Sequence, residues 1–115
     1  MRTKMFALVV AIVSLLLTSA AFAESSGPRY IQGIGCHLND KICYVHISGN
    51  AVGPWPCVSN SIRWTEDAAN GQSILALLRT ALVEQKPVNF EVRMDSCFAP
   101  QPDFPTFSYI NVFAS

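Results

Sequence analysis

Residues 70–94 constrain the fold more than any other stretch, because they join an amphipathic helix to a regular strand. In residues 72–85 the apolar side chains recur at the spacing of a helix with one buried face. They are Ile74, Leu75, Leu77, Leu78, Ala81 and Leu82. We expect the Asn70 side chain to cap the first turn and Pro87 to end the helix. Residues 88–94 then alternate between apolar and polar, which predicts a strand in a sheet that the helix covers.

The N-terminus has the pattern of an export signal. A basic start, an apolar run over residues 5–17 and the small-x-small sequence Ala21-Phe22-Ala23 follow one another. The run is shorter than the about 20 residues that a membrane helix needs. We therefore predict a signal peptide over residues 1–23 and one mature domain over residues 24–115, secreted or periplasmic.

The charge of the mature domain argues against two kinds of partner. The chain carries eight basic and eight acidic residues, and Arg2 and Lys4 lie in the predicted leader. Six basic and eight acidic residues remain, so the formal net charge of the domain is −2. Because there is no basic run, we expect no nucleic-acid partner. No second hydrophobic segment follows, so we expect no membrane span after cleavage.

Four cysteines lie in the mature part: Cys36, Cys43, Cys57 and Cys97. An even number in a short exported chain indicates two disulfides. A zinc site is the rival interpretation, but there is no Cys-x-x-Cys pair and neither histidine has a second ligand at metal-binding spacing. We expect no metal and no cofactor.

Three disulfide pairings remain open. The sequence between Cys36 and Cys43 suits a turn, which favours that pair across a hairpin together with Cys57–Cys97. The competitor joins Cys43 to Cys57 and Cys36 to Cys97. Loop-closure entropy does not separate the two sets, since they give about 6.4 and about 7.3 kcal/mol.

The order of predicted elements defines a fold class. We expect strands over residues 29–34, 42–47 and 57–64, then the helix, then strands over residues 88–94 and 106–113. Five strands with one helix between the third and the fourth is the element order of a small OB-like barrel. The predicted class is α+β, mainly β.

This layout resembles a known family. Cys43, the run Cys57-Val58-Ser59 and Ile62, followed by a helix, a strand and a final aromatic strand, are similar to the B subunits of the subtilase cytotoxin and typhoid toxin type. The pair Arg63-Trp64 before the helix is similar to a broader set of small exported bacterial proteins. The resemblance implies a ring of subunits that binds sialylated glycans, and it favours the Cys43–Cys57 pairing. The family's ligand-contacting serine lies in an N-terminal Ser-Asp-Glu segment, which this chain lacks.

The aromatic residues of two loops are the candidate ligand-binding residues. Trp55 lies between two prolines, where an exposed indole could stack on a sugar or contact a protein, or could pack over an end of the barrel. Phe98 and Phe104 lie in a proline-rich segment and could form an exposed apolar patch or fold back as a lid.

No catalytic residues are predicted. His37 and His46 are the only histidines, and no Gly-x-Ser-x-Gly motif is present. Glu66 and Asp67 are adjacent on a loop, so their carboxylates should point apart. We therefore expect a non-enzymatic binding module for a glycan or protein. The alternative is an exported structural or interaction protein, or an inhibitor, that assembles as a homo-oligomer.

Overall fold

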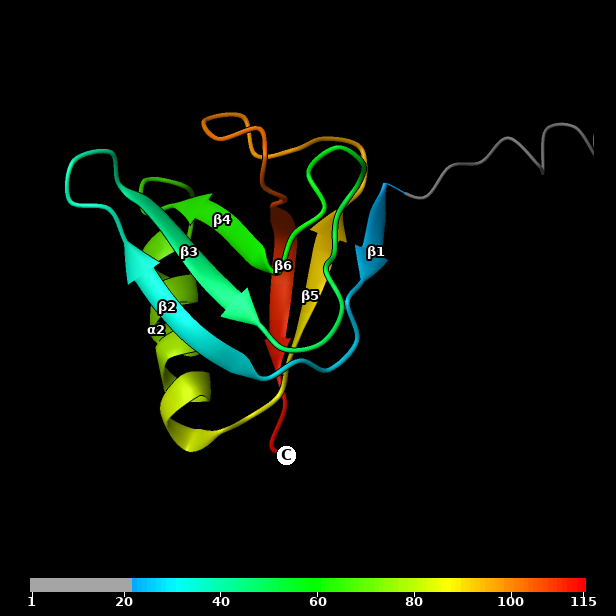
Figure 1. The fold of residues 1–115 in the computed structure, drawn as a ribbon. Coiled ribbons are helices and arrows are strands. Elements are labelled where there is room, and N and C mark those ends of the chain that lie inside the picture. Colours follow the sequence, from blue (N-terminus) through cyan, green and yellow to red (C-terminus); the bar gives the residue numbers. More distant parts are fainter. Residues whose placement is uncertain (1–21) are drawn as a thin grey trace, which may run out of the picture.

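The computed structural model describes residues 22–115 and consists of two small antiparallel sheets and one helix (Figure 1). The elements in chain order are β1 (Ala23–Ser25), β2 (Ile31–Cys36), β3 (Ile42–Ile47), β4 (Ser61–Thr65), α2 (Gly71–Glu84), β5 (Val88–Arg93) and β6 (Phe107–Val112). One sheet has the order β1-β5-β6 and the other the order β2-β3-β4. The predicted signal peptide lies outside the described residues except for Phe22 and Ala23.

The predicted five-stranded OB-like barrel is wrong. Residues 22–115 form six strands in two three-stranded sheets and no closed barrel, and the helix follows the fourth of these strands. The additional strand is β1, which pairs with β5 and precedes the first strand that we expected, at residues 29–34. From β4, Arg63 N donates to Pro105 O at 3.0 Å, two residues before β6 begins. The prediction of a mainly β chain is confirmed.

Arg29 connects the two sheets where β1 passes into β2. Its backbone exchanges two hydrogen bonds of 2.8 Å with Val88 at the start of β5. Its guanidinium donates to three carbonyl oxygens, those of Ser26, Ser48 and Asn50. One side chain therefore fixes the loop after β3 against the chain that enters β2.

The helix packs against β2 and β6, with Leu78 and Ala81 fully buried. The other buried members of the core come from both sheets: Ile31, Cys43, Val45, Ile47, Ile62, Trp64, Val88, Phe90 and Val92. Ile74, Leu75 and Leu82 are partly buried against this core. Leu77, which we expected to be buried, is 48% exposed because the buried stripe centres on Leu78.

The start of the helix differs from the prediction at Asn70. This residue has a left-handed backbone and its side chain makes no capping hydrogen bond. Trp64 Nε1 instead donates to the Gly71 carbonyl at 3.0 Å, which ties the helix start to β4. At the other end Gln85 takes the left-handed conformation, and the helix stops before Pro87 as predicted.

Both disulfides predicted from the hairpin argument are present. Cys36–Cys43 closes the β2–β3 hairpin, and Cys57–Cys97 joins the loop before β4 to the segment after β5. The Cys43–Cys57 pairing implied by the family resemblance is therefore wrong for this chain. Two disulfides agree with an exported protein in an oxidising compartment.

Gly71 should be the least replaceable glycine of the domain. A Cβ atom there would press against the backbone carbonyls of Thr65 and Glu66, which cannot move without displacing β4. We predict that Gly71→Ala lowers the free energy of unfolding by about 1–3 kcal/mol. Gly33→Ala is the control, because nothing lies within 4 Å of its Cβ position. Thermal unfolding of both variants checks this, and equal melting temperatures would contradict it.

Candidate functional site

The outer face of the β2-β3-β4 sheet exposes a group of planar side chains. β3 turns Cys43, Val45 and Ile47 into the core, so Tyr44 and His46 lie on the opposite face. Each stands opposite a glycine on β2: Tyr44 opposite Gly35, and His46 opposite Gly33. The Tyr44 ring lies over Gly35, so a side chain there would have to displace the ring. Tyr44 is therefore half-buried, whereas His46 is exposed and nothing lies within 4 Å of the Cβ position of Gly33 opposite it.

Arg63 extends this group across β4. Its guanidinium lies 5.0 Å from the centre of the Tyr44 ring and 3.6 Å from that of Phe104. It also donates to the Gln101 side chain. Burial lowers the pKa of the Arg63 guanidinium, and the charge interaction with Tyr44 opposes that shift. Arg63 thus holds the proline-rich segment, residues 98–106, against the sheet, and its charge is not free for a ligand.

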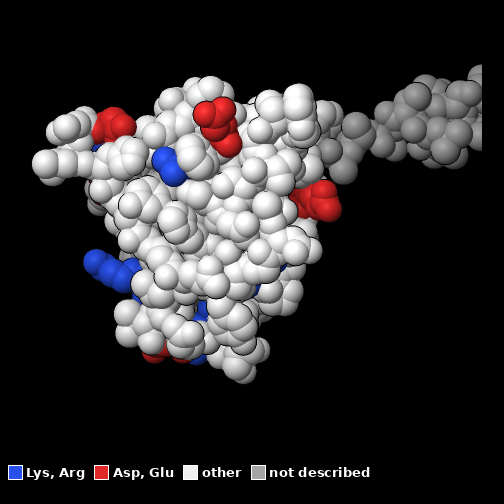
Figure 2. All heavy atoms as spheres, viewed as in Figure 1, with Lys and Arg blue, Asp and Glu red and all other residues white. Residues whose placement is uncertain are grey.

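A shallow hollow of about 700 Å³ lies beside His46 on this face. It is lined by Gln32, His46, Ile47, Gly49, Ala51, Val58, Ser59, Asn60 and Ser61. Asn60 donates to the carbonyls of Ile47 and Gly49, so its amide holds the loop together. Within residues 22–115, no hydrogen bond engages the side chains of Gln32 and His46. Most of the surface that faces the viewer in Figure 2, with β2 and β3 in front of α2, is uncharged.

The Trp55 indole is 88% exposed. Its loop is held on both sides: Cys57 N donates to Pro54 O at 2.8 Å, and Gly53 packs closely on Pro105. Cys57 is also disulfide-bonded to Cys97. This exposure excludes the interpretation that Trp55 packs over an end of the core. Whether it binds a ligand stays a prediction.

Phe98 and Phe104 fold back onto the domain. Phe98 is 7% exposed, and Phe104 is partly buried beneath the Arg63 guanidinium. Backbone hydrogen bonds between these two residues and Gln101 close the segment on itself. Phe98 also lines a cavity of about 330 Å³ between the start of α2 and β6. The arrangement corresponds to the lid rather than to an exposed patch.

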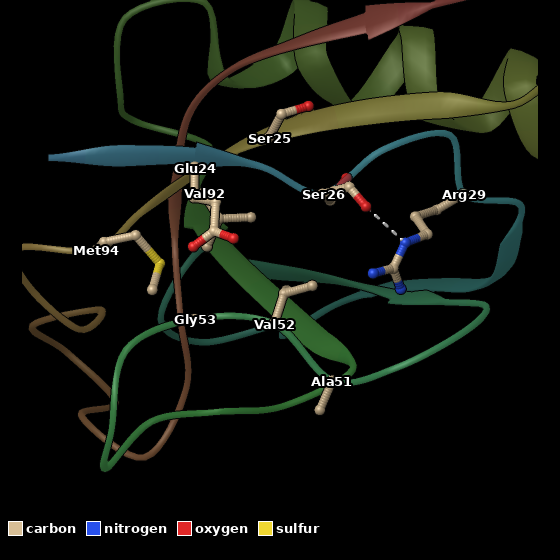
Figure 3. A pocket seen from close by; sticks show the side chains of 9 residues that line it. All are labelled: Glu24, Ser25, Ser26, Arg29, Ala51, Val52, Gly53, Val92 and Met94. Atoms are coloured by element: carbon tan, nitrogen blue, oxygen red, sulfur yellow. Dashed lines mark hydrogen bonds between the residues drawn. The ribbon is translucent and has the colours of Figure 1, made fainter. Parts of the chain in front are cut away.

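A further cavity of about 330 Å³ lies between β1, the end of β5 and the loop at residues 51–53 (Figure 3). Glu24, Arg29 and Met94 are among the residues that line it. The dashed bond in Figure 3 joins Arg29 to the Ser26 carbonyl. Because the Arg29 guanidinium is used to hold the backbone, the charge that this cavity presents to a ligand is the Glu24 carboxylate.

Neither histidine is paired with a nucleophilic side chain among the described residues. His37 Nδ1 is 3.0 Å from Asp40 at the tip of the β2–β3 hairpin, and this bond holds the pKa of Asp40 below its usual value. No hydrogen bond joins either histidine to a serine in the part of the chain that the structure describes. In these positions the two histidines can contribute surface contacts and hydrogen bonds to a ligand.

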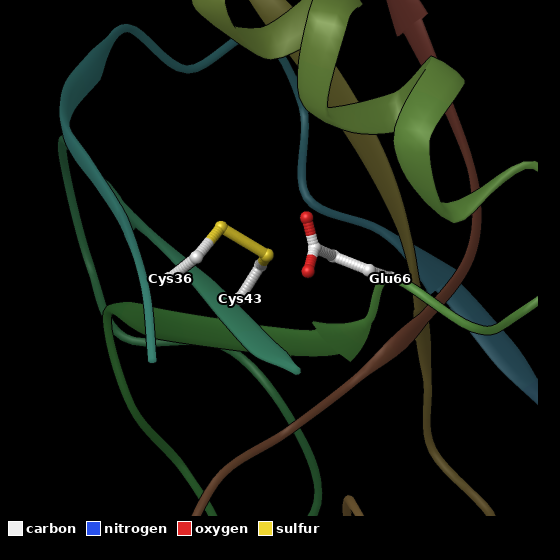
Figure 4. Close-up of side chains that lie close together, drawn as sticks. All are labelled: Cys36, Cys43 and Glu66. Carbon is white, nitrogen blue, oxygen red and sulfur yellow. A yellow bond between two sulfur atoms is a disulfide. The ribbon is translucent and has the colours of Figure 1, made fainter. Parts of the chain in front are cut away.

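One side-chain cluster has the composition of a metal site. Cys36, Cys43 and Glu66 bring two sulfur atoms and a carboxylate oxygen within 4.8 Å of one another (Figure 4). Both sulfurs belong to the disulfide, so they offer no thiolate to a metal ion. In this oxidised form the cluster is a carboxylate beside a disulfide.

Comparisons with known proteins give no further assignment. No protein-family model matches the chain, and no curated protein and no solved structure matches it. The resemblance to toxin B subunits therefore stays a prediction. Among residues 22–115, no helix has the length and apolar character to cross a membrane.

The structure brings together residues that sequence reasoning did not combine. Tyr44 and His46 are two residues apart in the strand predicted over residues 42–47, so a shared face follows from that prediction and is observed. The role of Gly33 and Gly35 was missed, because it depends on the register of β2 against β3. For Glu66 we expected only that its carboxylate points away from that of Asp67, and its position beside the disulfide left no signal in the sequence.

Arg63 should control the order of the proline-rich segment. We predict that Arg63→Ala lowers the free energy of unfolding by about 1–2 kcal/mol through the loss of its stacking and hydrogen bonds. In Arg63→Ala, hydrogen exchange at residues 98–106 should become faster than in the wild type, while exchange at β5 changes less. Arg79→Ala, on the exposed side of α2, is the control and should change neither quantity. Unchanged exchange at residues 98–106 in Arg63→Ala would show that the segment holds itself in place.

Proposed function

We propose that the chain is a non-enzymatic binding module, secreted or periplasmic, that recognises a glycan or a protein partner. The observation that supports this most is the exposed Trp55 on a doubly anchored loop. A rigid indole loses little conformational entropy when a ligand covers it, and tryptophan is enriched among the residues that dominate binding energy. An exposure of 88% leaves nearly the whole ring available.

The uncharged sheet face supports the same proposal. The hollow beside His46 offers the hydrogen-bonding groups of Gln32 and His46 next to the Tyr44 ring. Such a mixture of aromatic surface and neutral polar groups suits hydroxyl and amide groups of a ligand better than a strong charge. Arg63, the cation on this face, is already stacked between two rings and hydrogen-bonded.

Trp55→Ala tests the proposal directly. A glycan array and a pull-down from exported proteins would identify a ligand for the wild type, and we predict that Trp55→Ala weakens its binding at least tenfold. Leu38→Ala is the matched control, since Leu38 is 96% exposed at the tip of another loop. An array without binding, together with a pull-down that Trp55→Ala leaves unchanged, would contradict the proposal.

The second candidate function is an exported structural or interaction protein that assembles with its own copies. The observation that favours it is the far edge of β6, whose other edge pairs with β5. Beyond the Arg63–Pro105 contact, no backbone hydrogen bond from β4 reaches it among the described residues. Tyr109 and Phe113 nearby are 53% and 42% exposed. An unpaired edge with apolar side chains is suited to strand pairing between chains.

Light scattering separates this candidate from the first. If β6 mediates assembly, the wild type should have a mass that is a multiple of the monomer mass, and Tyr109→Lys should shift it toward the monomer. Leu38→Lys adds the same charge away from β6 and should leave the mass unchanged. A wild type that is strictly monomeric at high concentration would exclude the assembly function.

A further inference from the structure

The two cysteines of the Cys36–Cys43 disulfide differ in their access to solvent. Cys36 is exposed at the end of β2, whereas Cys43 has no exposed surface. In the other disulfide Cys57 is fully buried and Cys97 is partly buried. Thiol–disulfide exchange requires that a thiolate reach a sulfur atom, so access decides which sulfur is attacked. An external thiol can enter most readily at Cys36.

Glu66 places a negative charge beside this disulfide. Its backbone N–H donates to the Lys41 carbonyl at 2.9 Å, which holds the residue against the β2–β3 hairpin. A carboxylate oxygen then lies within 4.8 Å of both sulfur atoms, facing them as Figure 4 shows. Lys41, the nearest cation in sequence to the disulfide, pairs instead with Asp67 at 3.2 Å. Within the described residues, no hydrogen bond or ion pair compensates the Glu66 carboxylate.

We propose that Cys36 is a thiol-exchange site and that Glu66 makes it selective against anionic thiols. In the first step a small thiolate attacks Cys36 Sγ, a new S–S bond forms to the attacking sulfur, and the old S–S bond breaks. The electron pair of that bond leaves on Cys43 Sγ. A second equivalent of the same thiol then releases Cys36 as a thiolate and leaves with the first as a free disulfide. Two small thiols are thereby oxidised and one protein disulfide is reduced.

Glu66 opposes this reaction in two ways. The approaching thiol meets the field of the carboxylate, which repels a thiol that carries an additional negative charge. The departing Cys43 thiolate forms at a buried position next to the same carboxylate, which makes it a poorer leaving group for every thiol. Two unit charges 4.8 Å apart repel even at the dielectric constant of water, and with screening by salt the effect on rate is about threefold.

The test compares three thiols on the oxidised protein: cationic cysteamine, neutral 2-mercaptoethanol and anionic 2-mercaptoethanesulfonate. Each rate is measured at equal thiolate concentration and divided by the rate of the same thiol on an uncharged small disulfide, because the nucleophilicity of a thiolate falls with the pKa of its thiol. Alkylation at timed points followed by peptide mass spectrometry gives the rate at each cysteine. In the wild type, cysteamine should reduce Cys36–Cys43 at least threefold faster than 2-mercaptoethanesulfonate. Glu66→Gln should accelerate 2-mercaptoethanol about threefold and bring the cationic and anionic rates together.

Two controls isolate the effect of the carboxylate. Asp67→Asn removes the adjacent carboxylate, which points to Lys41, and should leave all three rates as in the wild type. Reduction of Cys57–Cys97 in the same samples should not respond to Glu66→Gln. If Glu66→Gln does not fold, the wild type decides alone, because added salt must reduce the preference for cysteamine. Equal rates for the three thiols at low salt, or a first mixed disulfide on Cys43, would overturn the proposal.

Discussion

The Cys57–Cys97 disulfide is the constraint on which the arrangement of the loops depends. It joins residues 40 positions apart and ties the loop before β4 to the segment after β5. By loop-closure entropy such a cross-link contributes about 4 kcal/mol, against about 2.4 kcal/mol for the short Cys36–Cys43 loop. A domain of this size has a total stability on the order of 5–15 kcal/mol, so that share is large. The same cross-link holds Trp55 on one side and the segment over Arg63 on the other.

Much of the fold was predictable where the signal is local or periodic. The helix and β5 follow from spacing alone. Tyr44 and His46 share the outer face of β3 as expected for alternate residues of a strand, although Ile42 at its start is buried. The hairpin turn between Cys36 and Cys43 was enough to favour the observed disulfide pairing. The barrel prediction failed because closure depends on how far β4 and β6 pair. Among the described residues, the backbone hydrogen bond from β4 toward this segment is that of Arg63 N to Pro105 O, which lies before β6 begins.

The candidate site was predictable only in part for a similar reason. The flanking prolines marked Trp55, but its exposure is decided by the packing of Gly53 on Pro105 and by the disulfide. Phe98 and Phe104 have the composition of a surface patch, yet Arg63 draws the segment down onto the sheet. Cross-strand register places Tyr44 over Gly35, and a chain reversal places Glu66 beside the hairpin disulfide. Each contact joins two separate segments of the chain, so neither produces a recognisable pattern in the sequence of one segment.

Hydrogen exchange in a variant that lacks the long cross-link tests the central claim most directly. In the double variant Cys57→Ser/Cys97→Ser, the amides of Val52 and Ser59, which bond each other's carbonyls at 3.0 and 2.9 Å, should be the reporters. The account predicts that their protection is lost under conditions in which β3 and β5 stay protected. Protection at Val52 and Ser59 equal to that of the wild type would contradict it, because the loop that carries Trp55 would then be ordered without the disulfide.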